Sequence, residues 1–135
     1  IALYKKNSDY IYINDKKKKH NTNIFYNDYL KWKDGLLNKI NKNDIIWGAS
    51  GKGVMMMNIL DLDYKYIPFV LDINQNISGK FFPITGNEII HPSKLKNQMT
   101  MNNKIIAMNK LYLKEINKEL SELGINADVV YIGDL

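Results

Sequence analysis

The sequence predicts an α/β fold: a three-layer, Rossmann-like parallel sheet in the strand order 3-2-1-4-5, with helices on both faces and an N-terminal β hairpin or extension. Residues 45–47 are apolar and lead into three glycines and then a helix-like segment, as in a nucleotide-binding strand, turn and helix. A second apolar run ends at Asp72, about 20 residues after the last glycine, where Rossmann folds place a carboxylate. Short apolar runs then alternate with helical patterns, which favours parallel strands joined by right-handed crossovers.

The N-terminal part of the chain is expected to precede this sheet. Residues 2–4 and 10–13 are β-prone and predict a hairpin, or the frayed end of a preceding sheet. From Ile24 to Ile40, apolar residues recur at three- and four-residue spacing, which predicts an amphipathic helix with one face to bury. We therefore expect a hairpin or extension at residues 1–23, or the end of a preceding domain, and a Rossmann-like domain at residues 24–135.

The remaining elements follow from the same patterns. The helix after the glycines runs through Leu62, and a helix with a leucine-lined face ends at Gly124, a suitable C-terminal cap. The long polar connection from Asn74 to Gly86 indicates a functional loop, because structureless loops of this length are otherwise uncommon. The other strands are expected at residues 67–71, 88–90, 104–108 and 127–132, with a brief helical turn after Pro92.

The composition excludes several classes of protein. At 135 residues the chain is one domain of ordinary size. It has no cysteine and only two histidines, which excludes disulfides, thiolate metal sites and a zinc cluster. The lack of a signal-peptide pattern and of an apolar run of about 20 residues predicts a cytoplasmic protein without a membrane partner. The net charge of +5 includes four lysines in one polar stretch, residues 16–19, so solvated loop charge is favoured over nucleic-acid binding.

The glycine-rich turn is the first candidate site. Gly48, Gly51 and Gly53 would let the backbone approach a ligand, while the helix start presents free amides and a positive dipole end to a phosphate. The spacing is not that of a Walker loop, so ATP hydrolysis is not expected, and Ser50 stands where the dinucleotide fingerprint has its second glycine. Lys52 is either a phosphate-neutralising charge or simply an exposed lysine. A tight structural turn without a ligand is the alternative.

Asp72 is the second candidate. It follows a strand and precedes Asn74, so it could accept hydrogen bonds from ribose hydroxyls, since open α/β sheets bind ligands outside the carboxyl ends of their strands. A cap on the following turn is the alternative. The sequence shows no Ser-His-Asp set, no pair of carboxylates in one motif and no histidine with an evident partner. We therefore predict a nucleotide-binding shape without catalytic residues or a metal site.

Four segments, taken together, resemble the C-terminal domain of the nucleotide-sugar C-methyltransferases. That family shows G-A-x-x-K-G, then V-D-x-N-P-x-K-x-G-x-x-x-P-G-T, and then P-x-x-L, in this order. The corresponding segments here are residues 46–53, 70–74, 79–86 and 90–95.

The resemblance extends from Tyr26 to Leu135 and has several departures. Asn109, with Tyr112, Glu115 and Ile116, is similar to the family's W-N-Y-x-x-E-I element, with the aromatic residue shifted. The departures are Gln75 for proline, Ile77 for lysine, Ile84 for glycine and Met108 for tryptophan.

The resemblance implies a binding domain of a larger enzyme. Such an enzyme has a small zinc-binding domain and a central S-adenosylmethionine domain upstream, and this chain, which begins at Ile1 and not at methionine, carries the signature of neither. No cofactor is expected in this chain, and its implied partners are the upstream methyltransferase domain and a nucleotide-linked sugar on the way to a deoxysugar. The implied substrate-binding residues, none of them catalytic, are Gly48, Ala49, Ser50, Gly51, Lys52, Gly53, Asp72, Asn74, Lys80, Pro83, Thr85 and Asn109.

Two other functions stay open. One is an NAD- or nucleotide-sugar-binding Rossmann module of a sugar N-acyltransferase-like enzyme, which also begins with a strand and a glycine-rich turn. The other is a non-catalytic scaffold domain, in which the glycine turn is purely structural.

Overall fold

The computed structural model of the chain describes residues 19–97 and 103–135, so the hairpin predicted at residues 2–13 lies outside the described residues. The chain divides into two compact units, Ile1–Trp32 and Lys33–Leu135. The second unit contains the sheet and all the sites described below.

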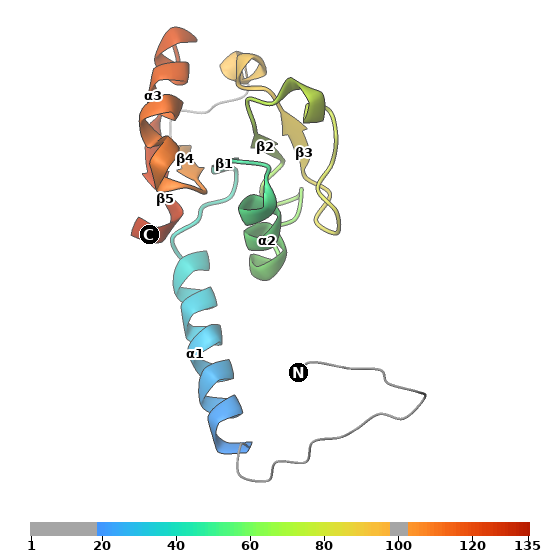
Figure 1. Cartoon of the computed structure of the whole chain (residues 1–135), viewed down its shortest axis with the longest axis vertical. Helices are drawn as coiled ribbons and strands as arrows, with labels where there is room; N and C mark the ends of the chain where they lie inside the picture. The colour runs from blue at the N-terminus through green and yellow to red at the C-terminus, as the bar shows by residue number, and fades with distance from the viewer. Residues whose placement is uncertain (1–18, 98–102) are drawn as a thin grey trace. The chain divides into compact units, whose positions relative to one another are not determined.

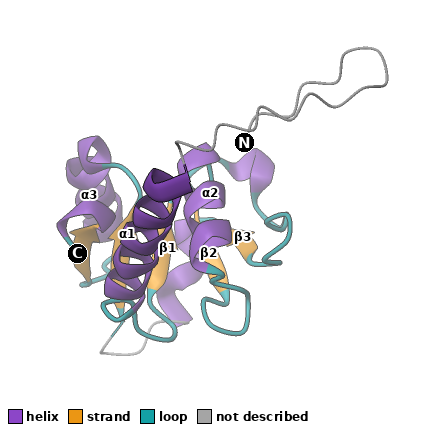
Figure 2. Ribbon diagram, turned by 90° about the horizontal axis from the view of Figure 1, so that it is seen from below, coloured by secondary structure: helices purple, strands orange, loops and turns teal. Residues whose placement is uncertain are grey.

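Five parallel strands form the sheet in the order β3-β2-β1-β4-β5, which confirms the predicted order (Figure 1). Ile46, in the middle of the central strand, lies opposite Val70 on one side and Ile106 on the other. The strands are short beside the helices and loops that connect them (Figure 2). They are β1 (Ile45–Trp47), β2 (Phe69–Leu71), β3 (Glu88–Ile90), β4 (Lys104–Ala107) and β5 (Asp128–Tyr131).

Both faces of the sheet are covered, which gives the predicted three layers. Ile46 belongs to a core cluster that includes residues of α2 (Gly51–Leu60), whereas Ile45 and Trp47 belong to a second cluster with residues of α3 (Leu113–Glu122). This division follows from the strand geometry, because successive side chains point to opposite faces. All three residues of β1 are buried, which explains why its sequence is a continuous apolar run instead of an alternating one.

The helices differ from the predicted ones mainly at their ends. The helix after the glycines ends at Leu60 and not at Leu62, because Asp61 takes a left-handed conformation with a φ of 55° and its N–H bonds back to the last turn. Gly124, with a φ of 68°, follows α3 as expected. Short 3-10 helices occupy Gln75–Ile77, Pro92–Asn97, Lys110–Tyr112 and Ile132–Asp134.

The first long helix, α1 (Lys19–Leu37), is confirmed, but the burial of its predicted apolar face is not. Phe25 is 81% exposed and Trp32 is 46% exposed, and burial begins only at Leu36 and Ile40. Phe25 and Trp32 belong to the first unit, whereas Leu36 and Ile40 belong to the second unit and join its core. Within the described part of the chain, none of the helices combines the length and apolarity that crossing a bilayer requires.

The long connection between β2 and β3 folds back on the outer edge of the sheet. Gly79 donates its N–H to the carbonyl of Ile89 at 2.7 Å, and Ile89 donates to the carbonyl of Lys80 at 2.8 Å. Phe81 and Glu88 add an antiparallel bridge. The connection therefore satisfies backbone groups of β3, an edge strand that would otherwise leave them unpaired.

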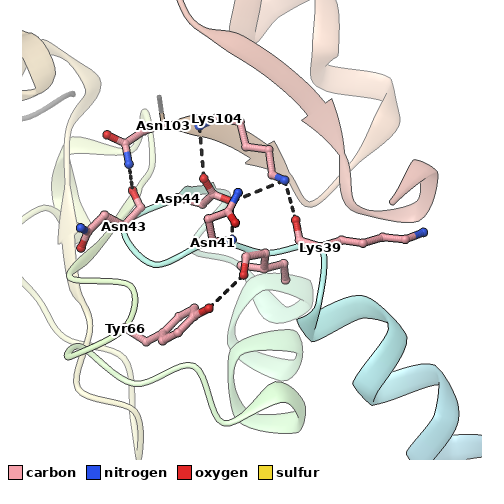
Figure 3. Close-up of polar contacts among 8 residues, drawn as sticks. Lys39, Asn41, Asn43, Asp44, Tyr66, Asn103 and Lys104 are labelled. Atoms are coloured by element: carbon pink, nitrogen blue, oxygen red, sulfur yellow. Dashed lines mark hydrogen bonds and ion pairs between the residues drawn. The ribbon is translucent and has the colours of Figure 1, made fainter. Parts of the chain in front are cut away.

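A polar network ties the loop before β1 to the start of β4 (Figure 3). Asp44, which is 0% exposed, accepts hydrogen bonds from the N–H of Asn41 at 2.8 Å and from the N–H of Lys104 at 3.3 Å. The ammonium group of Lys104 lies 3.5 Å from the same carboxylate and also donates to the carbonyl of Lys39. We call this network, centred on Asp44 and Lys104, the Asp44 clasp.

Candidate functional site

The turn after β1 depends on glycine at two positions. Gly48 has a φ of 119°, which side-chain-bearing residues rarely adopt, and its N–H donates to the carbonyl of Leu71 at 2.8 Å. At Gly53, a Cβ atom would lie 1.9 Å from the carbonyl oxygen of Gly48. The start of α2 therefore packs directly on the backbone of the turn, as the third glycine of a Rossmann fingerprint allows.

The start of α2 has the features of an anion site. Ser50 is the N-cap, with extended backbone angles, but its side chain makes no capping hydrogen bond. The first amides of a helix have no partner within the helix and carry its positive dipole end. Gly51 and Lys52 are exposed there, so a ligand has access to this helix start. This arrangement suits a phosphate.

Asp72 lies beside this turn, at the carboxyl end of β2. One carboxylate oxygen accepts from the N–H of Ala49 at 2.8 Å, and the other accepts from the N–H of Asn74 at 2.9 Å. The second of these bonds is the turn cap that the sequence allowed as the alternative role. A carboxylate has about four lone-pair positions, so two backbone bonds fix its orientation and still leave acceptors for a ligand.

A cavity of about 720 Å³ opens beside the turn. It is lined by residues that follow β1, β2 and β4. In the order 3-2-1-4-5, the chain changes direction between β1 and β4, and open α/β sheets bind their ligands at this switch point. The volume is within the range of small-molecule sites.

Half of the predicted binding residues line this cavity. They come from three separate parts of the chain, which the fold brings to one cavity. They are Gly48, Ser50, Gly51, Lys52, Asp72 and Asn109.

The other predicted residues lie outside the cavity lining. Ala49 contributes its N–H to Asp72, Gly53 contributes close packing, and Asn74 caps a 3-10 helix by accepting from the N–H of Asn76. Lys80, Pro83 and Thr85 belong to the loop on the β3 edge, where Lys80 and Pro83 are exposed and Thr85 is buried. A binding role for these three residues stays a prediction.

The cavity also has lining residues to which the sequence gave no binding role. Three of them lie on or just before α3, at positions 112, 115 and 119, a spacing that places them on one helix face. The family motif pointed to Tyr112 and Glu115, but Glu119 could be found only from that helical spacing. The seven additional lining residues are Trp47, Ile73, Met108, Tyr112, Glu115, Ile116 and Glu119.

The charges around the cavity are unevenly distributed. Lys52 lies at the start of α2, whereas Glu115 and Glu119 come from α3, and Asp72 lies at the end of β2. One cation and three carboxylates therefore line the cavity. Among the residues that the structure describes, no group of three or more histidines, aspartates or glutamates is placed to hold a metal ion.

These features define a Rossmann-like domain with a ligand-sized cavity at its switch point. The family of C-methyltransferase C-terminal domains matches residues 27–127, and the chain belongs to this family. No curated protein matches the chain significantly.

Proposed function

We propose that this domain binds the nucleotide-linked sugar substrate of an S-adenosylmethionine-dependent sugar C-methyltransferase. Methyl transfer itself is assigned to another domain, which carries the methyl donor. In the binding mode that we propose, the diphosphate lies at the start of α2, beside Lys52, and Asp72 accepts hydrogen bonds from ribose hydroxyls.

One observation supports this proposal above the others: Asp72 is fixed by backbone N–H groups while it lines the same cavity as the exposed start of α2. A phosphate-binding helix start and a ribose-binding carboxylate on the next strand are the two parts of a Rossmann nucleotide site. Membership of the C-methyltransferase family supports the type of enzyme to which the site belongs.

Titration of the full chain with TDP- and UDP-linked sugars tests the proposal. Gly51→Ala is the informative variant, because Gly51 lines the cavity and a Cβ there would meet no other atom within 4 Å. Alanine should keep or slightly raise stability, by up to about 1 kcal/mol, while the new methyl group hinders the close approach of a phosphate. We expect roughly tenfold weaker binding.

Gly35→Ala is the matched control. Gly35 lies in α1, also has open space around the position of a Cβ, and is not part of the cavity lining. It should gain the same helix stability and keep the affinity of the parent chain. An absence of binding across the whole panel, or equal losses in both variants, would contradict the proposal.

The excess of carboxylates favours one second candidate, a cationic ligand. S-adenosylmethionine combines a ribose with a sulfonium and an ammonium group, which Asp72, Glu115 and Glu119 could accommodate. Titration with S-adenosylhomocysteine, which keeps the ribose and the ammonium group, separates the two functions. Binding of this compound in the absence of nucleotide-sugar binding would favour the second candidate.

A further inference from the structure

The cavity has two sides of different chemistry. On one side, the turn after β1 and the start of α2 provide backbone amides and the ammonium group of Lys52. On the other side, Tyr112, Glu115 and Glu119 project from α3 and the turn before it. A ligand that carries its negative charge at one point should therefore bind in one direction only.

The α3 side offers groups that suit a carbohydrate. Tyr112 is 56% exposed, and Asn109 uses its side-chain oxygen to cap the turn, by accepting from the N–H of Leu111 at 3.2 Å. The amide N–H groups of Asn109 are not used in this cap. Carboxylates accept hydrogen bonds from hydroxyl groups, and an amide donates to them, so the set contains both kinds of partner and an aromatic surface.

The two glutamates of this side are not used in ion pairs along the helix. The ion pair on α3 joins Lys118 to Glu122, at 3.7 Å, and neither residue lines the cavity. Glu115 and Glu119 lie one turn apart on the face that does line it. Glu115 lies in the first turn of α3, where the helix dipole offsets part of its charge, but both carboxylates still repel a diphosphate. This repulsion supports placing the phosphates on the opposite side, beside Lys52.

We propose that the glycosyl group of the ligand lies against α3, where Glu115 and Glu119 select its hydroxyl pattern, while the nucleoside extends past Asp72, beyond the carboxyl end of β2. This inference rests on the proposed function and adds the direction of the substrate in the site. It makes Glu115 and Glu119 specificity residues for the sugar and not for the nucleotide.

The test compares each nucleotide with and without its sugar. The probes are UDP, UDP-glucose, TDP and TDP-glucose, and binding is followed by the fluorescence of Trp47, which lines the cavity, in a Trp32→Phe background. In Glu115→Gln and Glu119→Gln, we expect unchanged or tighter binding of UDP and TDP, because a negative charge near the diphosphate is removed. The gain in affinity from the sugar should fall roughly tenfold, because hydrogen bonds to a charged acceptor are lost.

Glu122→Gln is the matched control, since it removes the same charge from the same helix outside the cavity. It should leave the sugar-dependent gain unchanged. If Glu115→Gln and Glu119→Gln change the affinities for nucleotide and nucleotide sugar by the same factor, or change neither, the direction of binding is wrong but the proposed function stands. If the parent chain binds none of the four probes, the proposed function fails, and this inference fails with it.

Discussion

Asp44 and Asp72 show how one residue type takes different roles at the two ends of a sheet. Each accepts hydrogen bonds from two backbone N–H groups of neighbouring segments. Asp44 precedes β1, is fully buried and has the ammonium group of Lys104 as a third partner. Asp72 follows β2, is half-buried and lines a cavity.

The difference lies in the acceptor capacity that each carboxylate keeps. The Asp44 clasp surrounds its carboxylate with protein donors, so it can only join segments of the chain (Figure 3). Asp72 is also oriented by two backbone N–H groups, but its remaining lone pairs lie beside open space. A carboxylate that the backbone orients and that stays accessible can bind a ligand without first changing its conformation.

The largest effect should come from Asp44→Ala. The change removes the acceptor of two backbone amides and the partner of Lys104 in a buried place, so we expect a loss of about 3 kcal/mol in the free energy of unfolding. Asp134→Ala is the control, because its ion pair with Lys110 is exposed and should contribute under about 1 kcal/mol. Urea unfolding measures both, and similar losses would show that the clasp is unimportant.

Gly53→Ala should have the next largest effect and tests the rigidity of the turn at the other end of the sheet. The new Cβ would lie 1.9 Å from the carbonyl oxygen of Gly48, which is backbone and cannot rotate away. We expect about 2 kcal/mol of destabilisation, within the usual cost of overpacking. Thermal unfolding beside Gly51→Ala, which has open space, measures the difference. Equal stability of the two variants would mean that the turn can move.

Part of the fold and part of the candidate site could be predicted from the sequence. The strand order and the meeting of the glycine turn with Asp72 were predictable, because apolar runs, glycine spacing and strand ends are local signals with a fixed consequence in a parallel sheet. The place of Glu119 in the cavity lining was not predicted, since a glutamate on a helix is ordinarily solvated. Only the position of α3 against the strand ends makes it part of a cavity.

The Asp44 clasp was not predicted for a related reason. An aspartate before a strand reads as an ordinary turn residue, and its main partner, Lys104, lies 60 positions further along the chain. In the loop from Asn74 to Gly86, the sequence carried a clear signal, but that signal has two explanations. The length of this loop indicated function, but the structure uses much of its backbone to pair with the edge of β3.

Asp72→Asn should have a small effect on stability and a large one on binding. It replaces one charged acceptor and places an amide donor against a backbone N–H, for a loss of about 1 kcal/mol in the free energy of unfolding. Affinity for nucleotide sugars should fall about tenfold.

Asp63→Asn is a close control for this change. The carboxylate of Asp63 accepts from the N–H groups of Lys65 and Tyr66, at 3.0 and 3.3 Å, and is not part of the cavity lining. Because a single oxygen of Asp63 accepts both bonds, asparagine can keep them with its own amide oxygen, so this variant should lose less stability than Asp72→Asn and keep its affinity. Calorimetric titration of both variants with the same ligand decides whether Asp72 serves the ligand or only the turn.

Ile84→Gly should have the smallest effect and examines a third region, the loop on the β3 edge. Ile84 has a φ of 73°, which is strained for a β-branched residue, and its side chain is 94% exposed, so little packing is lost with it. Glycine relieves this strain but adds freedom to the unfolded chain, and we expect a net gain of about 0.5 to 1 kcal/mol by urea unfolding. A loss of stability would show that the side chain makes contacts that its exposure does not reveal.

The same variant decides whether this loop belongs to the binding site. Lys80, Pro83 and Thr85 flank Ile84 but do not line the cavity. If the cavity alone holds the ligand, Ile84→Gly gains stability and keeps the parent affinity for nucleotide sugars. A change in affinity beyond about threefold, roughly 0.6 kcal/mol, would instead couple the loop to the ligand and return these three residues to the site. In that case the site would extend from the switch point to the outer edge of the sheet, and an anchored carboxylate beside a cavity would mark only one part of it.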